Sequence, residues 1–131
     1  MPLLYEHYVL GLLREAYGDQ ILYQAEGSTG CPDFICLDPR LVMDTKYIPR
    51  FKDKTKISPY IIRQLSGYAR DRKLFKDPIK EPIPCLVIYP EEGAERNPFR
   101  DKPLRELLHE IEEEKSAWGF YRLAVPLPTL R

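Results

Sequence analysis

The sequence predicts an α/β domain with a mixed central sheet flanked by helices. Segments with helical spacing of apolar residues alternate with short apolar segments, in the order helix, strand, strand, strand, helix, strand, helix, strand. A tight turn between the second and third strand segments favours antiparallel pairing of these two strands. The continuous apolar run CLVIY at 85–89 is typical of a central strand buried on both faces. With 131 residues, 44% of them apolar, the chain is expected to form a single domain over 1–131.

The N-terminal segment predicts a helix over residues 3–17. Pro2 suits the first helical turn, and Gly18 suits the position just past the helix end. The apolar side chains recur at helical spacing, and they are Leu3, Leu4, Tyr8, Val9, Leu10, Leu12 and Leu13. A short strand over 21–26 follows, and then a flexible loop over 27–30.

The next segments predict a hairpin. Strands over 32–37 and 41–47 are joined by the tight-turn sequence Asp-Pro-Arg at 38–40. After a polar loop, Ser58 and Pro59 are typical of an N-cap and a first helical position, which predicts a helix running to about residue 75.

The C-terminal part predicts three further elements separated by proline-containing loops. These are the buried strand over 85–89, a helix over 103–115 and a last strand over 119–125.

Composition excludes several classes of protein. No apolar run approaches the ~18 residues of a membrane span, so no membrane partner is expected. The N-terminus lacks an early Lys or Arg and a small-residue cleavage site, which argues against a signal peptide. The three cysteines include no CxxC pair, so the default location is a reducing cytoplasm. The seven glycines form no GxGxxG or Walker motif, which argues against a nucleotide-binding enzyme.

Two carboxylates and one ammonium fall near one end of the predicted hairpin. Asp44 and Lys46 are two residues apart on one strand, so their side chains point to the same face. The turn folds the preceding strand back and can bring Asp33 opposite Asp44. Close carboxylates repel each other, and a divalent cation that prefers oxygen, Mg²⁺ or Mn²⁺, removes that cost. The pattern predicts a metal held by Asp33, Asp44 and the Thr45 carbonyl, with Lys46 stabilising a phosphate charge or orienting water.

A simpler interpretation of these residues stays open. Asp44 and Lys46 would form a surface ion pair, and Asp33 would cap a turn. The apolar residues at 41–43 weaken this interpretation, because charged residues within an apolar strand need a partner or a function.

The same motif resembles a known family. The PD at 32–33 and the DTK at 44–46 resemble the signature of the PD-(D/E)XK nuclease superfamily. Gln64 and Tyr68, four apart on one helical face, resemble the QxxxY motif of its RecB-like branch. The DTKY segment, the QLSGYA helix and the strand ending LVIYP at 86–90 are together similar to McrC, the nuclease subunit of modification-dependent restriction systems.

The resemblance covers about residues 3–90 and implies a fold, an activity and partners. The fold would be the restriction-endonuclease-like αβββαβ core. The activity would be Mg²⁺-dependent (or Mn²⁺-dependent) hydrolysis of DNA phosphodiester bonds in restriction, defence or DNA repair. The protein would act as a homodimer or with a motor-subunit partner, such as the GTPase McrB. The implied site residues are catalytic Asp33, Asp44 and Lys46, metal-facing Glu6 in the first helix, and supporting Gln64 and Tyr68.

Two alternative functions stay open on the same fold. One is a structure-specific endonuclease that resembles Holliday-junction resolvases. The other is a non-catalytic nucleic-acid-binding module, against which the intact set of Asp33, Asp44 and Lys46 argues.

Positive charge is concentrated between residues 46 and 80. This segment holds eleven basic and three acidic residues, although the whole chain has no net charge. Such asymmetry favours a polyanionic partner, while a solvated surface balanced by acidic residues elsewhere is the alternative. The candidate phosphate contacts are Arg50, Lys52, Lys54 and Lys56 in the loop beside the site and Arg63 on the following helix.

Overall fold

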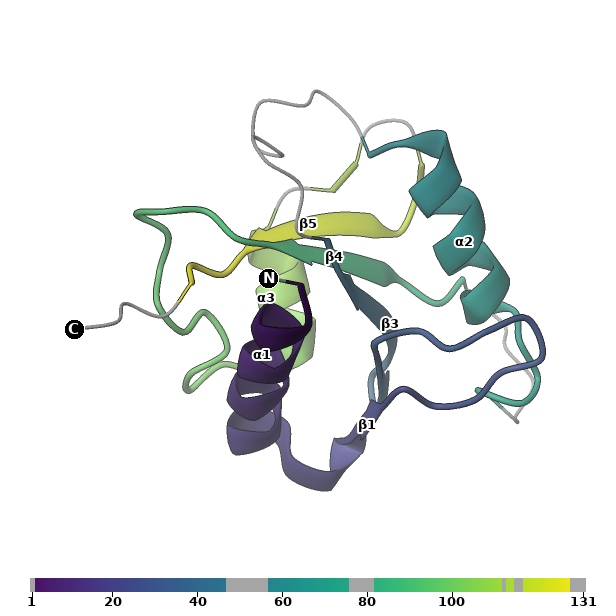
Figure 1. Cartoon of the computed structure of the whole chain (residues 1–131), viewed down its shortest axis with the longest axis horizontal. Coiled ribbons are helices and arrows are strands. Elements are labelled where there is room, and N and C mark those ends of the chain that lie inside the picture. The colour runs from purple at the N-terminus through teal and green to yellow at the C-terminus, as the bar shows by residue number, and fades with distance from the viewer. Residues whose placement is uncertain (1, 47–56, 76–81, 112, 115–116, 128–131) are drawn as a thin grey trace.

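The computed structural model describes residues 2–46, 57–75, 82–111, 113–114 and 117–127 (Figure 1). Its helices and strands follow in the predicted order, with one additional short 3-10 helix, η1, after the first helix. The elements are α1 Pro2–Tyr17, η1 Gly18–Gln20, β1 Ile21–Tyr23, β2 Phe34–Leu37, β3 Arg40–Thr45, α2 Pro59–Ala69, β4 Cys85–Tyr89, α3 Leu104–Glu110 and β5 Phe120–Ala124. None of the described helices combines the length and the apolar character needed to cross a membrane.

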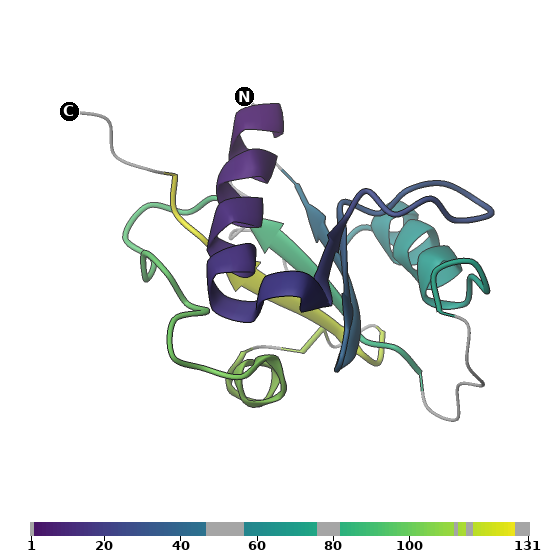
Figure 2. The ribbon, with the colours of Figure 1, turned by 90° about the horizontal axis from the view of Figure 1, so that it is seen from below.

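The strands form one five-stranded sheet in the order β1-β2-β3-β4-β5. β2 is antiparallel to both β1 and β3, whereas β3, β4 and β5 run parallel to one another. α1 and α3 cover one face of the sheet, and α2 covers the other (Figure 2). The predicted α/β class with a mixed sheet flanked by helices is confirmed, as is the predicted β2–β3 hairpin.

The side chains of β3 alternate between two hydrophobic cores. Leu41 and Met43 pack with α1 and α3, while Val42 packs with α2 on the opposite face. The residues of β4 divide in the same way, and all of them up to Ile88 are buried. The apolar run at 85–89 is therefore the doubly covered strand that the sequence predicts.

Two strands are shorter than predicted because the chain leaves the sheet between them. β1 ends at Tyr23, and Gln24 adopts a left-handed conformation with φ of 48°. The Gln24 N–H donates to the Asp33 carbonyl at 2.9 Å, which closes a loop ahead of β2. β2 accordingly begins at Phe34 and not at 32.

Two helices also end earlier than predicted. α2 ends at Ala69, and the turn that follows is held by Asp71, whose carboxylate accepts backbone N–H groups from the turn itself and from the distant loop over 27–30. α3 ends at Glu110, because the chain then extends toward β5 and the Glu114 N–H donates to the Phe120 carbonyl at 2.6 Å. In both cases contacts distant in sequence override the local helical pattern.

Candidate functional site

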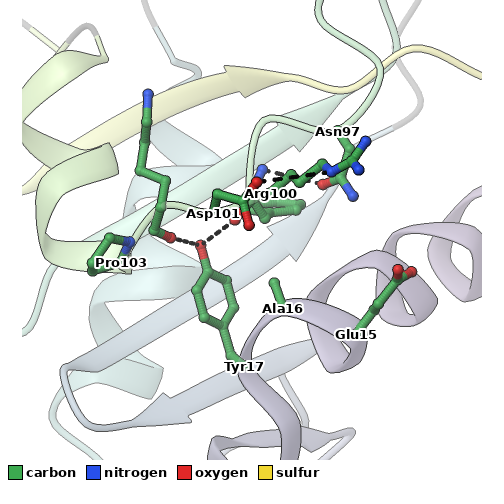
Figure 3. Close-up of a pocket in the computed structure, with 9 residues that line it drawn as sticks. Glu15, Ala16, Tyr17, Asn97, Arg100, Asp101 and Pro103 are labelled. Carbon is green, nitrogen blue, oxygen red and sulfur yellow. Dashed lines mark hydrogen bonds and ion pairs between the residues drawn. The ribbon is translucent and has the colours of Figure 1, made fainter.

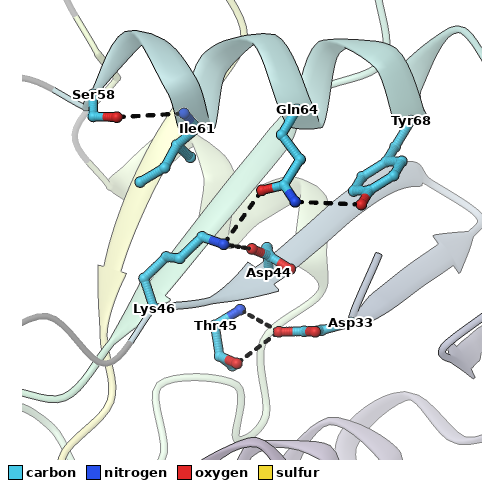
Figure 4. Close-up of polar contacts among 8 residues, drawn as sticks. All are labelled: Asp33, Asp44, Thr45, Lys46, Ser58, Ile61, Gln64 and Tyr68. Atoms are coloured by element: carbon cyan, nitrogen blue, oxygen red, sulfur yellow. Dashed lines mark hydrogen bonds and ion pairs between the residues drawn. The ribbon is translucent and has the colours of Figure 1, made fainter. Parts of the chain in front are cut away.

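The candidate site lies at the end of the β2–β3 hairpin away from its turn. The register pairs Phe34 with Met43, which places Asp33 and Asp44 opposite each other at the next position. Asp33 Oδ2 accepts hydrogen bonds from the Thr45 backbone N–H at 2.8 Å and from Thr45 Oγ1 at 2.7 Å (Figure 4). The two carboxylates that the sequence expects to meet are therefore neighbours, and Asp33 is fixed to β3.

Asp44 is a buried carboxylate near the C-terminal end of β3. It is 5% exposed, and its Oδ2 lies 2.6 Å from Lys46 Nζ. Apart from this ion pair, Oδ2 has no hydrogen-bond partner among the described residues. Burial and the charge of Asp33 raise the pKa of Asp44 to about 6, although the Lys46 ammonium opposes the shift. Asp44 is thus a carboxylate whose charge the protein stabilises incompletely.

Helix α2 supplies a chain of polar side chains to Lys46. Lys46 Nζ donates to Gln64 Oε1 at 3.4 Å, and Gln64 Nε2 donates to Tyr68 OH at 3.5 Å. Figure 4 shows these side chains pointing from α2 toward Asp44 and Lys46. The helix begins at the predicted N-cap, where Ser58 Oγ accepts from a backbone N–H at 3.4 Å. The structure thus brings Gln64 to the ammonium group and Tyr68 to the Gln64 amide.

Helix α1 brings a third carboxylate to the same end of the sheet. Glu6 Oε2 accepts from Tyr23 OH at 2.6 Å and from Gln24 Nε2 at 3.1 Å. Burial and the neighbouring Asp33 carboxylate raise the pKa of Glu6 in spite of these bonds. The bond to Glu6, more than burial, raises the pKa of Tyr23 to about 12. Sequence reasoning predicted Glu6 at the site but missed Tyr23 and Gln24, which hold its carboxylate.

The available oxygens decide whether a metal ion fits. The N–H and C=O of one strand residue point to the same side of the strand, so the Thr45 carbonyl faces the side on which Asp33 lies. That carbonyl and the under-compensated Asp44 carboxylate are hard oxygen donors, which suit Mg²⁺ or Mn²⁺. Among the described residues, no group of three or more His, Cys, Asp or Glu side chains is arranged to hold a metal. A cation at Asp33 and Asp44 would therefore also need backbone or water oxygens.

Comparisons with known proteins name no relative. No family model, no curated protein and no solved structure matches the chain. Membership of the PD-(D/E)XK superfamily accordingly stays a prediction from the residues.

A glycine-rich loop forms one wall beside α2. The buried Asp71 carboxylate accepts the backbone N–H groups of Ser28 at 2.5 Å and Thr29 at 3.3 Å. A Cβ on Gly27 would lie only 2.5 Å from Asp71 Oδ2, and one on Gly30 would lie 3.1 Å from the Tyr68 hydroxyl. Burial raises the pKa of Asp71, but hydrogen bonds from backbone N–H groups outweigh burial and lower it overall. Sequence reasoning missed Asp71, whose one visible signal is an acidic residue directly after a helix.

The predicted phosphate contacts fall into two groups. Arg63 lies exposed on α2, on the side of the helix away from the core. The loop residues Arg50, Lys52, Lys54 and Lys56 lie outside the described residues. Their proposed contact with nucleic acid therefore stays a prediction from the sequence.

A separate pocket of about 550 Å³ opens at the other end of α1 (Figure 3). Tyr17 OH donates to the carbonyls of Lys102 at 2.8 Å and Phe99 at 3.4 Å, which ties α1 to the loop before α3. The pocket is lined by Glu15, Ala16, Tyr17, Asn97, Phe99, Arg100, Asp101, Lys102 and Pro103. None of the residues predicted for the site lines it, and its charges are mixed, so it adds nothing to the chemistry of the hairpin end.

Proposed function

We propose that this chain is a metal-dependent nuclease that hydrolyses phosphodiester bonds of DNA. One observation carries the proposal. The buried carboxylate of Asp44 lies beside that of Asp33, and its negative charge is paired with a single ammonium group, that of Lys46. A protein gains nothing structurally from placing like charges together in a partly dry site. A divalent cation would remove the cost and would supply a charge suited to a phosphate substrate.

Asp33, Asp44 and the Thr45 carbonyl would hold the cation, with Glu6 nearby on the α1 side. Bound Mg²⁺ or Mn²⁺ would polarise the phosphodiester and lower the pKa of an attached water molecule. Asp33 is held in position by its two bonds from Thr45, so it presents a fixed ligand.

Lys46 would act on the substrate side of the site. Its ammonium is paired with Asp44 and would orient water and stabilise the phosphate oxygens. Gln64 holds Nζ through its carbonyl oxygen, and Tyr68 holds the Gln64 amide in turn. This chain limits the positions open to the Lys46 ammonium, which is what a preorganised charge stabiliser requires.

The element order supports a restriction-endonuclease-like core for this activity. From α1 to β4 the order is αβββαβ, with an antiparallel hairpin followed by a parallel strand reached through α2. The site stands at the hairpin end where these elements meet. We propose DNA as the partner and the cytoplasm as the place of action.

The proposal is tested by DNA cleavage. The purified chain is incubated with supercoiled, linear and branched DNA, and with RNA, in Mg²⁺, Mn²⁺ or EDTA. We expect cleavage of DNA that requires the cation and falls at least ~10²-fold in Asp44→Asn. Asp38→Asn is the matched control, because Asp38 lies on the same hairpin, has an 80% exposed side chain and pairs with Arg105.

Two results would reject the nuclease. One is the absence of cation-dependent cleavage of any substrate by the wild type. The other is cleavage by Asp44→Asn at the rate of the Asp38→Asn control. Preference for the branched substrate would favour the resolvase-like form of the same chemistry.

A further inference from the structure

Four exposed basic side chains lie on the outer side of α2 and in the turn after it. Arg63 lies exposed on the helix, Arg70 lies exposed at its C-cap, and Arg72 and Lys73 lie exposed in the turn that follows. Within the part of the chain that the structure describes, none of the four side chains forms an ion pair. Asp71 lies between them, but it is buried and its carboxylate is taken by backbone N–H groups. We call Arg63, Gly67, Arg70, Arg72 and Lys73 the α2 basic face.

Gly67 lies in the middle of this face, and nothing in the described part of the chain requires glycine there. It is exposed within α2, and it is not among the described glycines with positive φ. Among the described residues, a Cβ there would meet only Thr29 Oγ1, at an ordinary 3.9 Å. Glycine inside a helix is less stable than alanine, so the fold alone would favour a larger residue. A glycine with open space above it suits close approach by something outside this chain.

The α2 basic face adjoins the candidate site. Gly67 follows Gln64 by three residues and therefore lies about 60° round the helix axis from it. The exposed Thr29 hydroxyl of the glycine-rich loop stands next to Gly67 on the other side. In Figure 2 this loop and α2 lie side by side, across the sheet from α1. A strand that enters the site could therefore run across Gly67.

We propose that the α2 basic face binds the phosphate backbone of duplex DNA, with Gly67 as the point of closest approach. This proposal rests on the proposed nuclease function and names the surface that holds its substrate. Arg63 and Arg70 are seven residues apart, about 10 Å along the helix axis. At a rise of about 3.4 Å per nucleotide, that distance covers roughly three phosphates of one strand. Arginine is the side chain best suited to such contacts because its planar guanidinium binds phosphate through two N–H groups.

The test measures binding apart from cleavage. Fluorescence anisotropy of a labelled duplex is recorded in EDTA over a series of salt concentrations, and cleavage is measured separately in Mg²⁺. Neutralising both arginines, in Arg63→Gln with Arg70→Gln, should lower the slope of log K against log salt by up to about 1.8. Gly67→Ala should weaken binding at least about fivefold, because a methyl group would enter a closely packed contact.

Gly11→Ala is the matched control for the glycine. Gly11 is likewise an exposed glycine inside a helix, and no atom of the described residues lies within 4 Å of a Cβ placed on it. Both alanine variants should raise the Tm by roughly 3 °C, since both remove a glycine from a helix. Only Gly67→Ala should lose DNA affinity.

The outcomes separate this surface from the nuclease itself. If the wild type cleaves DNA but Gly67→Ala and the double arginine variant bind like the wild type, the surface is wrong and the nuclease stands. If the wild type binds no duplex, or binds polyglutamate as tightly as duplex DNA, the surface is also rejected. Loss of cleavage in Asp44→Asn with retained binding would support both proposals.

Discussion

Asp44 should destabilise the metal-free protein, and Asp44→Asn should therefore stabilise it. The pKa of this carboxyl is raised from 3.8 to about 6 by burial and by Asp33, so folding favours its protonated form. The cost is absent below about pH 4, grows as the pH rises, and is complete above about pH 6. A shift of this size lowers the free energy of unfolding by about 3 kcal/mol at pH 8, and this is the net effect after the favourable ion pair with Lys46.

The assay is thermal unfolding in EDTA between pH 4 and pH 8. Asp44→Asn should match the wild type near pH 4 and exceed its Tm by up to roughly 10 °C at pH 8. With Mg²⁺ at ten times its dissociation constant, the wild type should regain about 1.4 kcal/mol, and the variant should not. The interpretation of Asp44 is refuted if the variant is less stable than the wild type at pH 8, or if their difference does not change with pH.

Three further predictions concern Lys46, Asp71 and the basic loop. Lys46→Ala should keep the fold by circular dichroism and lose ~10²–10³ in cleavage rate, and a wild-type rate would remove Lys46 from the mechanism. Asp71→Ala should cost about 2 kcal/mol in urea unfolding and speed amide exchange at Ser28 and Thr29, because a buried charged acceptor is lost. Unchanged exchange would show that another contact holds the loop. Neutralising the basic loop should flatten the salt slope of duplex binding by at most roughly 3.6, whereas a solvated loop would leave it unchanged. The four loop residues neutralised together are Arg50, Lys52, Lys54 and Lys56.

The elements that sequence reasoning placed best are those whose signals are local. β4 covers the predicted 85–89 because the run is wholly apolar and is followed by proline. The hairpin follows from the turn sequence at 38–40, and its register puts Asp33 across from Asp44. The approach of Gln64 and Tyr68 to the site follows from their spacing on one helical face.

The features that sequence reasoning missed depend on contacts distant along the chain. The Asp71 carboxylate accepts backbone N–H groups 42 and 43 residues earlier in the chain. The local sequence pattern therefore predicts neither the conformation of the loop over 27–30 nor the end of α2. α3 ends early because Glu113 forms an antiparallel bridge with Tyr121 of β5. The partners of Glu6 were missed because β1 stops at Tyr23 and turns Gln24 toward α1.

Manganese binding followed by electron paramagnetic resonance tests the metal site most directly. The free Mn²⁺ signal is titrated against the wild type, Asp44→Asn and the control Asp38→Asn at pH 7.5. We expect saturable binding by the wild type and the control, and loss of that site in Asp44→Asn. Equal binding by all three proteins, or none by the wild type, would contradict a cation held between Asp33 and Asp44.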